Sequence, residues 1–294
     1  MNKRSITPFA GIAVSVGIAG LVALAGSDHG EAIGGFRVFA LCAIGAFSIQ
    51  WLAFIPAYFF KTEKFFDLTG GLTYITLVAF ALLAAGNWDA RSLVLAALVV
   101  AWAVRLGSFL FARVLRSGGD SRFEAMKRQL PGFLLTWTLQ GLWVLLTVST
   151  ALAAISSNQP APLDWTAFAG LAIWAAGFAV EVAADAQKQR FRSDPANRGQ
   201  FIRSGLWAWS RHPNYFGEIV IWIGVAVVAA PSLSGWQWVT MVSPVFVTFL
   251  LTRVSGIPLL ERRGMQRWGN DPAYREYLAT TPVLVPRPFA RSRR

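Results

Sequence analysis

Long apolar runs separated by short polar segments are the feature that most constrains the fold of this sequence. A run of roughly 17–25 apolar residues matches the thickness of a bilayer core, and in lipid it must form a helix to satisfy its backbone. With 55% hydrophobic and 14% charged residues, the chain is unlike a soluble domain. We therefore predict an all-α, polytopic membrane helix bundle of about eight spans, forming one integral domain over residues 1–294. The predicted spans are Pro8–Ala25, Gly35–Phe60, Thr69–Gly86, Ser92–Phe111, Gly132–Ile155, Asp164–Arg190, Asn214–Ala230 and Trp236–Leu260.

The positions of the basic residues predict the orientation of these spans. The net charge is +12, but the basic residues lie between apolar runs rather than on a separate basic domain, which argues against a nucleic-acid partner. If both termini are cytoplasmic, 24 of the 27 Lys and Arg lie in or beside cytoplasmic segments, the exceptions being Arg37, Arg91 and Arg105. Because cytoplasmic loops are enriched in Lys and Arg, we predict cytoplasmic N- and C-termini. The opposite loops are short, so a functional site should open to the cytoplasm.

Two further features limit the possible interpretations. Cys42 is the single cysteine, and His29 and His212 are the only histidines, so we expect no disulfide within the chain and no metal site. No glycine-rich Rossmann fingerprint or P-loop occurs. The first span ends in Ala23-Leu24-Ala25, which also fits the cleavage site of a signal peptide, so both interpretations of that span stay open.

Polar side chains gather just before the seventh apolar run, in the segment Ser204–Glu218. Polar groups at the mouth of a membrane helix are costly unless they have a partner or a function. Pro213 favours a helix start, and the free N–H groups of a first helical turn bind phosphate readily. The segment predicts either a cofactor-binding mouth at the membrane surface or an interfacial loop with an Arg–Glu pair. Its polar members are Arg211, His212, Asn214, Tyr215 and Glu218.

The same segment resembles a known signature. Arg-His-Pro-Asn-Tyr-Phe-Gly-Glu, preceded by Gly-Leu-Trp, is similar to the motif of the steroid 5-alpha-reductase-like superfamily, in its bacterial uncharacterised branch. A shorter Arg-His-Pro-x-Tyr-x-Gly core also occurs in isoprenylcysteine and phospholipid methyltransferases. The resemblance covers about residues 61–286, which implies a reductase-like core there and extra N-terminal spans over 1–60, in the bacterial inner membrane.

The resemblance also implies an activity. It implies a helical membrane fold that binds NADPH in its cytosolic half and admits an apolar, steroid- or lipid-like substrate from the lipid. The implied reaction is hydride transfer to the β-carbon of an enone-like C=C bond, followed by protonation. In such an enzyme the cofactor carries the hydride, and the protein supplies binding and orientation.

A polar helical face follows the sixth apolar run. Glu181, Asp185, Lys188 and Arg192 are spaced by four, three and four residues, so they share one face of a helix. An exposed ladder of ion pairs is one interpretation. The other is a polar cavity, because Glu181 directly follows an apolar run and a carboxylate at membrane depth should not face lipid. By resemblance, Glu181, Asp185 and Arg192 match positions that contact the nicotinamide cofactor.

Further cofactor contacts are implied elsewhere. Arg105 and Arg116 lie on nearly the same helical face, and Arg116 can reach a phosphate, although snorkelling of Arg105 is the simpler interpretation. The C-terminal segment resembles the superfamily ending, or else forms an amphipathic surface helix. A surplus of Arg near the mouth favours NADPH over NADH. The implied cofactor-binding residues are Arg116, Glu181, Asp185, Arg192, Arg211, His212, Asn214, Tyr215, Glu218, Glu261 and Tyr274.

Candidate catalytic residues lie between the second and third spans. Glu63 and Asp67 are four residues apart and would share a helical face, although Asp67 also fits a helix cap or dipole partner. A carboxyl group in an apolar pocket has a raised pKa and can donate a proton. By resemblance, such a carboxylate pairs with a tyrosine to polarise the substrate carbonyl. Trp102 occupies the position of that tyrosine, so Tyr74 would replace it, and this departure weakens the case for a steroid.

Two alternative functions remain open. The first is an S-adenosylmethionine-dependent lipid or isoprenylcysteine methyltransferase, which needs no buried proton donor. The second is a non-catalytic lipid-binding membrane protein, which would show no saturable cofactor binding. In each case the expected partners are membrane lipids and an apolar, lipid-like molecule, with no nucleic acid and no metal.

Overall fold

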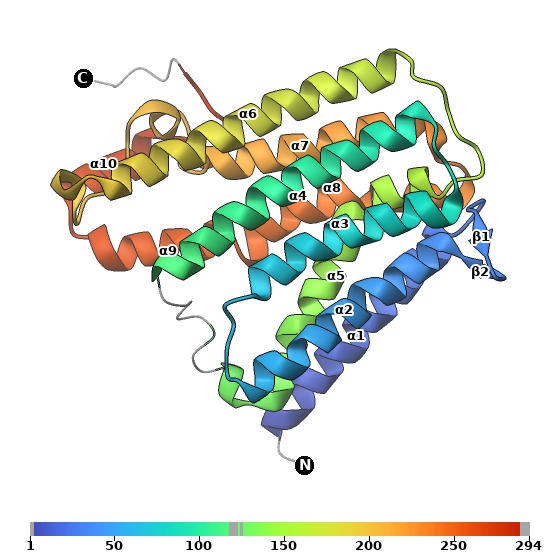
Figure 1. Ribbon diagram of the computed structural model, residues 1–294. Coiled ribbons are helices and arrows are strands. Elements are labelled where there is room, and N and C mark those ends of the chain that lie inside the picture. The colour runs from blue at the N-terminus through green and yellow to red at the C-terminus, as the bar shows by residue number, and fades with distance from the viewer. Residues whose placement is uncertain (1–2, 118–122, 124–125, 289–294) are drawn as a thin grey trace. The chain divides into compact units, whose positions relative to one another are not determined.

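The computed structural model (Figure 1) describes residues 3–117, 123 and 126–288. By its internal contacts the chain divides into two compact units. Unit 1 comprises residues 1–168 and 225–243, and unit 2 comprises residues 169–224 and 244–294. The helices α6 (Trp165–Ser193) and α7 (Pro213–Ala229) each contribute to both units. The single domain over residues 1–294 stays a prediction.

Within the described residues, eight helices are long and apolar enough to cross a membrane. Most of them begin and end within three residues of the spans that the apolar runs predict. The all-α, polytopic helix bundle is therefore confirmed, whereas the cytoplasmic placement of the termini stays a prediction. The spans are Thr7–Gly26, Val38–Phe59, Phe66–Ala85, Ala90–Ala112, Leu130–Ile155, Trp165–Ser193, Pro213–Ser232 and Gly235–Trp268.

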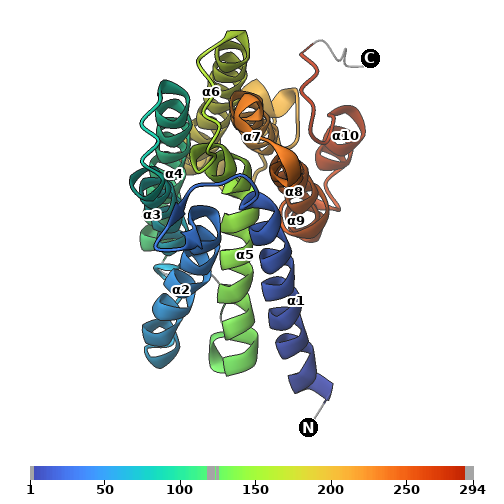
Figure 2. The same cartoon turned by 90° about the vertical axis from the view of Figure 1, so that its right-hand side faces the viewer.

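Unit 1 is built around α5. The most apolar part of the α5 span is 89% buried, compared with 22% for the first span. It contacts α1, α2, α3 and α4, and Figure 2 shows it running between α1 and α2. A helix that is apolar on all sides favours such a central position. The bounds are α1 (Lys3–Gly26), α2 (Val38–Phe59), α3 (Phe66–Ala85), α4 (Ala90–Ser117) and α5 (Leu130–Ile155).

A short β-hairpin precedes α2. The strands β1 (Ala32–Ile33) and β2 (Phe36–Arg37) pair antiparallel. Gly34 and Gly35 form the turn with φ angles of 57° and 82°, a left-handed conformation that a two-residue hairpin requires and glycine adopts freely. The second span therefore begins at Val38, three residues after its predicted start, because Gly35 to Arg37 belong to the hairpin.

The guanidinium of Arg91 joins three segments of unit 1 at one end of the helices. The side chain is 1% exposed and pairs with Asp164 at 2.8 Å. It also donates hydrogen bonds to the backbone carbonyls of Val228 at 2.6 Å and Ala161 at 3.2 Å. Hydrogen bonds from Thr166 and Arg91 lower the pKa of the Asp164 carboxyl to about 2. Arg91 directly precedes the fourth predicted span, but nothing in the sequence indicated its burial.

The eighth span is not one continuous helix. It consists of a 3₁₀ segment (Gly235–Met241), α8 (Val242–Phe249), a π-helical turn (Leu250–Val254) and α9 (Ile257–Trp268). Gly256 adopts ψ of −92°, outside the helical region, and breaks the chain direction ahead of α9. The predicted eighth span, Trp236–Leu260, therefore ends inside α9, eight residues before Trp268. The last helix, α10 (Pro272–Thr280), follows α9.

Candidate functional site

Glycines bring the backbones of α6 and α7 together in unit 2, where the two helices run side by side (Figure 1). A Cβ atom on Gly217 would lie 2.7 Å from the carbonyl oxygen of Gly177 and 2.7 Å from the amide nitrogen of Glu181. Seven residues further along α7, a Cβ atom on Gly224 would lie 2.6 Å from the amide nitrogen of Trp174. Only glycine fits such close contacts between membrane helices. The contact places the polar end of α6 beside the start of α7.

This contact joins two of the predicted site residues. The Asn214 Nδ2 atom donates a hydrogen bond to Asp185 Oδ1 at 3.3 Å. The Asp185 side chain is buried, with 7% of its residue surface exposed, and Asn214 is half-buried in the first turn of α7. Glu181, one turn earlier on α6, is 2% exposed. The face of α6 that was expected to line a polar cavity is therefore shielded from solvent at Glu181 and Asp185.

A second set of predicted residues meets at the start of α9. Glu261 Oε1 lies 3.1 Å from Arg211 Nη1 and 3.5 Å from His212 Nε2. The second distance is long for a hydrogen bond. The His212 ring stacks on Tyr215 with centroids 5.7 Å apart and planes 10° apart. The basic pair before α7 and the acidic residue of α9 thus form one cluster.

Burial decides the charge of His212. Loss of solvation lowers the pKa of this imidazole below its ordinary value, while the nearby Glu261 acts in the opposite direction. Lys188 and Arg211 lower it further by repulsion of the protonated form. His212 is therefore neutral at pH 7, with one ring nitrogen able to donate and the other able to accept a hydrogen bond.

Besides His212 Nε2 and Glu261 Oε1, which face each other at 3.5 Å, three buried polar atoms of this cluster lack a hydrogen-bond partner among the residues that the structure describes. They are Arg211 Nε, His212 Nδ1 and Asn214 Oδ1. An unsatisfied buried polar atom costs about 1–3 kcal/mol, and native proteins keep few of them. Three in one four-residue segment therefore point to a polar ligand as the missing partner.

The residues before the motif hold this cluster in place. Trp207 is 3% exposed, and its Nε1 atom donates to the carbonyl of Ala184 on α6 at 3.0 Å. Tyr277 of α10 donates to the carbonyl of Trp207 at 2.8 Å. Ser210 donates to the carbonyl of Leu284 at 2.7 Å, which ties down the C-terminal segment. The sequence alone did not indicate that these residues support the cluster, although a tryptophan inside a basic stretch was an available signal.

Tyr274, a predicted cofactor contact, is involved in packing. It is 6% exposed, and its ring meets that of Phe201 with centroids 4.9 Å apart. A Cβ atom on Gly264 of α9 would lie only 2.0 Å from the Tyr274 hydroxyl. Burial and the charge of Glu261 raise the pKa of this phenol, so it stays protonated. These contacts fix α10 against α9.

The remaining predicted cofactor contacts lie on α4, α6 and α7. Tyr215 and Glu218 lie half-buried in the first turns of α7, and Arg192 is exposed in the last turn of α6. Lys188 Nζ lies 4.3 Å from the centroid of the Trp207 ring, a cation–π contact. The backbone of Arg116 belongs to the last turn of α4, but its side chain lies outside the described part of the chain.

The two candidate carboxylates of unit 1 differ in their surroundings. Asp67 lies in the first turn of α3, and Phe65 rather than Asp67 is the N-cap residue. The cap interpretation was therefore wrong, although a first-turn carboxylate still complements the helix dipole. Glu63 precedes α3, is 5% exposed and pairs with Lys127 at 3.1 Å. The expectation of one shared helical face was wrong, because the helix begins only at Phe66.

Tyr74 lies against Trp102, the residue that stands in the expected tyrosine position. The two rings are 5.1 Å apart between centroids and nearly perpendicular, at 87°. Tyr74 is 5% exposed and Trp102 is 3% exposed. Asp67 and Tyr74 are seven residues apart on α3 and so lie on one face of this helix. Whether they act on a substrate stays a prediction.

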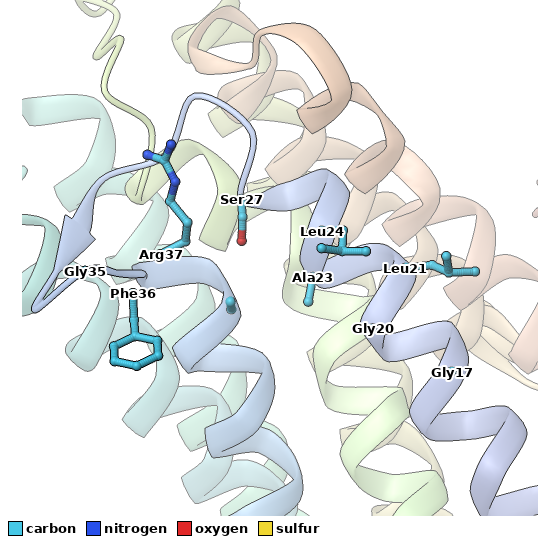
Figure 3. Close-up of a pocket in the computed structure, with 10 residues that line it drawn as sticks. Gly17, Gly20, Leu21, Ala23, Leu24, Ser27, Gly35, Phe36 and Arg37 are labelled. Carbon is cyan, nitrogen blue, oxygen red and sulfur yellow. The ribbon is translucent and has the colours of Figure 1, made fainter.

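A groove at the junction of α1 and α2 (Figure 3) contains none of the predicted site residues. Its lining is mostly apolar, with Gly17, Gly20 and Leu24 from α1 and Phe36 and Arg37 from the hairpin. The guanidinium of Arg37 donates a hydrogen bond to the carbonyl of Gly30. Within the described ranges no group of three or more His, Cys, Asp and Glu residues could hold a metal ion.

One known protein family matches most of the chain. A family model described as a protein of unknown function (DUF1295) matches residues 53–281. The steroid 5-alpha-reductase DET2 of Gossypium hirsutum is 30% identical over 122 residues, which is 42% of this chain and 42% of that protein. The match thus spans less than half the length of this relative. No solved structure matches the chain.

Proposed function

Because the chain belongs to the DUF1295 family, within the steroid 5-alpha-reductase-like superfamily, we propose that it is a membrane-embedded, NADPH-dependent oxidoreductase. Its substrate is an apolar, steroid- or lipid-like enone, whose C=C bond is reduced. The name of the Gossypium hirsutum relative supports the reaction class, and the buried polar cluster of unit 2 supports the choice of binding site.

The cluster of Arg211, His212, Asn214 and Glu261 is the observation that carries this proposal. It combines a guanidinium, a neutral imidazole, an amide and a carboxylate, of which three atoms lack partners among the described residues. A dinucleotide presents phosphates, ribose hydroxyls and a carboxamide, which need donors and acceptors of these kinds. The residues present therefore fit the cofactor that the family implies.

Each residue has a role in this proposal. Side chains that donate hydrogen bonds or carry positive charge hold the phosphate and ribose oxygens. The carboxylates accept hydrogen bonds from hydroxyl or amide groups of the cofactor. Bound NADPH supplies the hydride to the β-carbon of the enone. The phosphate and ribose contacts are Arg116, Arg192, Arg211, His212, Asn214 and Tyr215, and the acceptors are Glu181, Asp185, Glu218 and Glu261.

Protonation of the substrate is assigned to unit 1. Asp67 or Glu63 holds a proton and, with Tyr74, polarises the enone carbonyl. The ammonium group of Lys127 occupies one carboxylate oxygen of Glu63 at 3.1 Å. This ion pair stabilises the charged form of the Glu63 carboxyl group.

The S-adenosylmethionine-dependent methyltransferase is the second candidate. Arg211, His212, Pro213 and Tyr215 are all part of the shorter motif that both classes share, so the cluster alone does not separate them. A methyl transfer to a lipid or prenylcysteine requires neither a hydride donor nor a proton donor. The two candidates therefore differ in which ligand binds and in the need for Asp67.

Thermal denaturation of the detergent-purified protein with NADPH, NADH or S-adenosylmethionine separates the candidates. A ligand that binds only the folded state stabilises it by about 2.7 kcal/mol at one hundred times its Kd. We expect NADPH to raise Tm, NADH to raise it less and S-adenosylmethionine to have no effect. Stabilisation by S-adenosylmethionine alone would support the methyltransferase, and no effect of any ligand would leave a lipid-binding membrane protein.

A further inference from the structure

Two buried glutamines of unit 1 hold α3, the helix that carries both Asp67 and Tyr74. Gln140 on α5 is 8% exposed, and its Nε2 atom donates to the carbonyl of Phe66 at 3.1 Å. Gln50 on α2 is fully buried, and its Nε2 atom donates to Thr73 Oγ1 at 2.9 Å. Each glutamine thus contacts the residue directly before a candidate catalytic residue.

The surrounding residues make these contacts specific. A Cβ atom on Gly70 would lie 2.6 Å from Gln140 Nε2, so glycine at this position admits the amide. The Thr73 hydroxyl donates in turn to the carbonyl of Thr69 at 2.7 Å, which links Gln50 to the helix backbone. Phe66 and Thr73 are seven residues apart, so the two glutamines fix the same face of α3 at two levels.

Helix packing alone does not explain the two amides. The Oε1 atoms of Gln50 and Gln140 are buried without a hydrogen-bond partner among the described residues. An unsatisfied oxygen in an apolar region costs free energy that a methionine of similar size would avoid. The benefit of each glutamine must therefore lie in the geometry that its Nε2 contact imposes on α3.

We propose that Gln140 and Gln50 are positioning residues, which set the depth and rotation of α3 and thereby the places of Asp67 and Tyr74. Both act through the backbone or hydroxyl group of a neighbouring residue and contact no reacting atom. The part of this proposal that concerns catalysis rests on the proposed reductase function. The clamping of α3 itself does not.

The variants Gln140→Met and Gln50→Met test this proposal, with Thr138→Val as the control. Thr138 is fully buried on α5, two residues from Gln140, and its Oγ1 atom accepts a hydrogen bond from Trp51 of α2 at 3.0 Å. The control therefore removes a buried hydrogen bond between α2 and α5 in which α3 takes no part. Tm of all three variants shows whether they fold.

Two measurements decide the outcome: hydrogen exchange of the α3 amides, and NADPH-dependent reduction of progesterone as an enone probe over a pH series. We expect both methionine variants to exchange faster in α3 and to lose about 10- to 100-fold in kcat, with KM for NADPH unchanged and the pH profile shifted. Thr138→Val should keep the wild-type kcat and pH profile. Wild-type α3 exchange in both methionine variants would overturn the proposal, as would an equal loss of kcat in the control.

A wild-type protein that does not reduce progesterone counts against the proposed function with this probe and not against the clamp. In that case the exchange rates decide alone. Faster α3 exchange in the methionine variants than in Thr138→Val supports the clamp, and equal rates refute it.

Discussion

Gly217 provides a direct test of how the sequence builds the polar cluster of unit 2. In the variant Gly217→Ala, the new methyl group would lie 2.7 Å from two backbone atoms, the oxygen of Gly177 and the nitrogen of Glu181. Favourable contacts of carbon atoms lie at roughly 3.5 Å or more. Because neither backbone atom can rotate away, α6 and α7 must separate by on the order of 0.5–1 Å.

The cost of this separation follows from two opposing effects. Overpacking costs about 1–3 kcal/mol, while alanine is about 1 kcal/mol more favourable than glycine inside a helix. The net loss of folding free energy is then about 0–2 kcal/mol. The Asn214–Asp185 hydrogen bond is already 3.3 Å long, so the same separation breaks it. A lost hydrogen bond of about 0.5–1.5 kcal/mol weakens NADPH binding by up to roughly tenfold.

NADPH titration and thermal denaturation of Gly217→Ala and Gly224→Ala separate these effects. The control Gly224→Ala crowds the same helix pair, with its Cβ atom 2.6 Å from the Trp174 nitrogen, but about 10 Å further along α7. We expect both variants to lose similar stability and only Gly217→Ala to lose NADPH affinity. Equal losses of affinity in the two variants, or none in Gly217→Ala, would refute the reasoning.

Three further predictions concern other parts of the molecule. Arg91→Leu removes the donors of several buried carbonyls and should lower the free energy of unfolding by about 3–5 kcal/mol, and an unchanged denaturation curve would contradict this. Asp67→Asn should abolish enone reduction with NADPH binding retained, and full enone reduction by this variant would exclude Asp67 as the proton donor. Because burial lowers the pKa of His212, the unfolded state takes up its proton first, so stability should fall as pH drops below about 6.5. His212→Phe should remove this component, and an identical pH slope in the variant would argue against it.

Local sequence features were sufficient to predict the spans. Each span is a property of its own residues, since a long apolar run in lipid has no alternative to a helix. The break at Gly256 was less accessible, because the sequence there remains mostly apolar across the π-helical turn. Glu63 shows a similar limit: its spacing from Asp67 fits a helix, yet the helix begins three residues later.

Contacts between distant residues account for most of what the sequence did not predict. The burial of Arg91 depends on Asp164 and on the carbonyl of Val228, which are 73 and 137 residues away along the chain. The resemblance assigned both Asp185 and Asn214 to one cofactor site, and so anticipated that these two residues lie close together. The glycine contacts that produce this pairing were not anticipated, since a single glycine in an apolar run carries no signal of its partner.

The affinity of NADPH for the variant Asn214→Ala tests the central claim most directly. Asn214 contributes both a hydrogen bond to Asp185 and a buried oxygen without a partner among the described residues. Asn270 is exposed in the turn between α9 and α10, so Asn270→Ala is the matched control. Titration of the purified protein with NADPH should give saturable binding, a Kd at least about tenfold higher for Asn214→Ala, and a wild-type Kd for Asn270→Ala. Saturable binding with the same Kd in all three proteins would show that the buried cluster does not hold the cofactor.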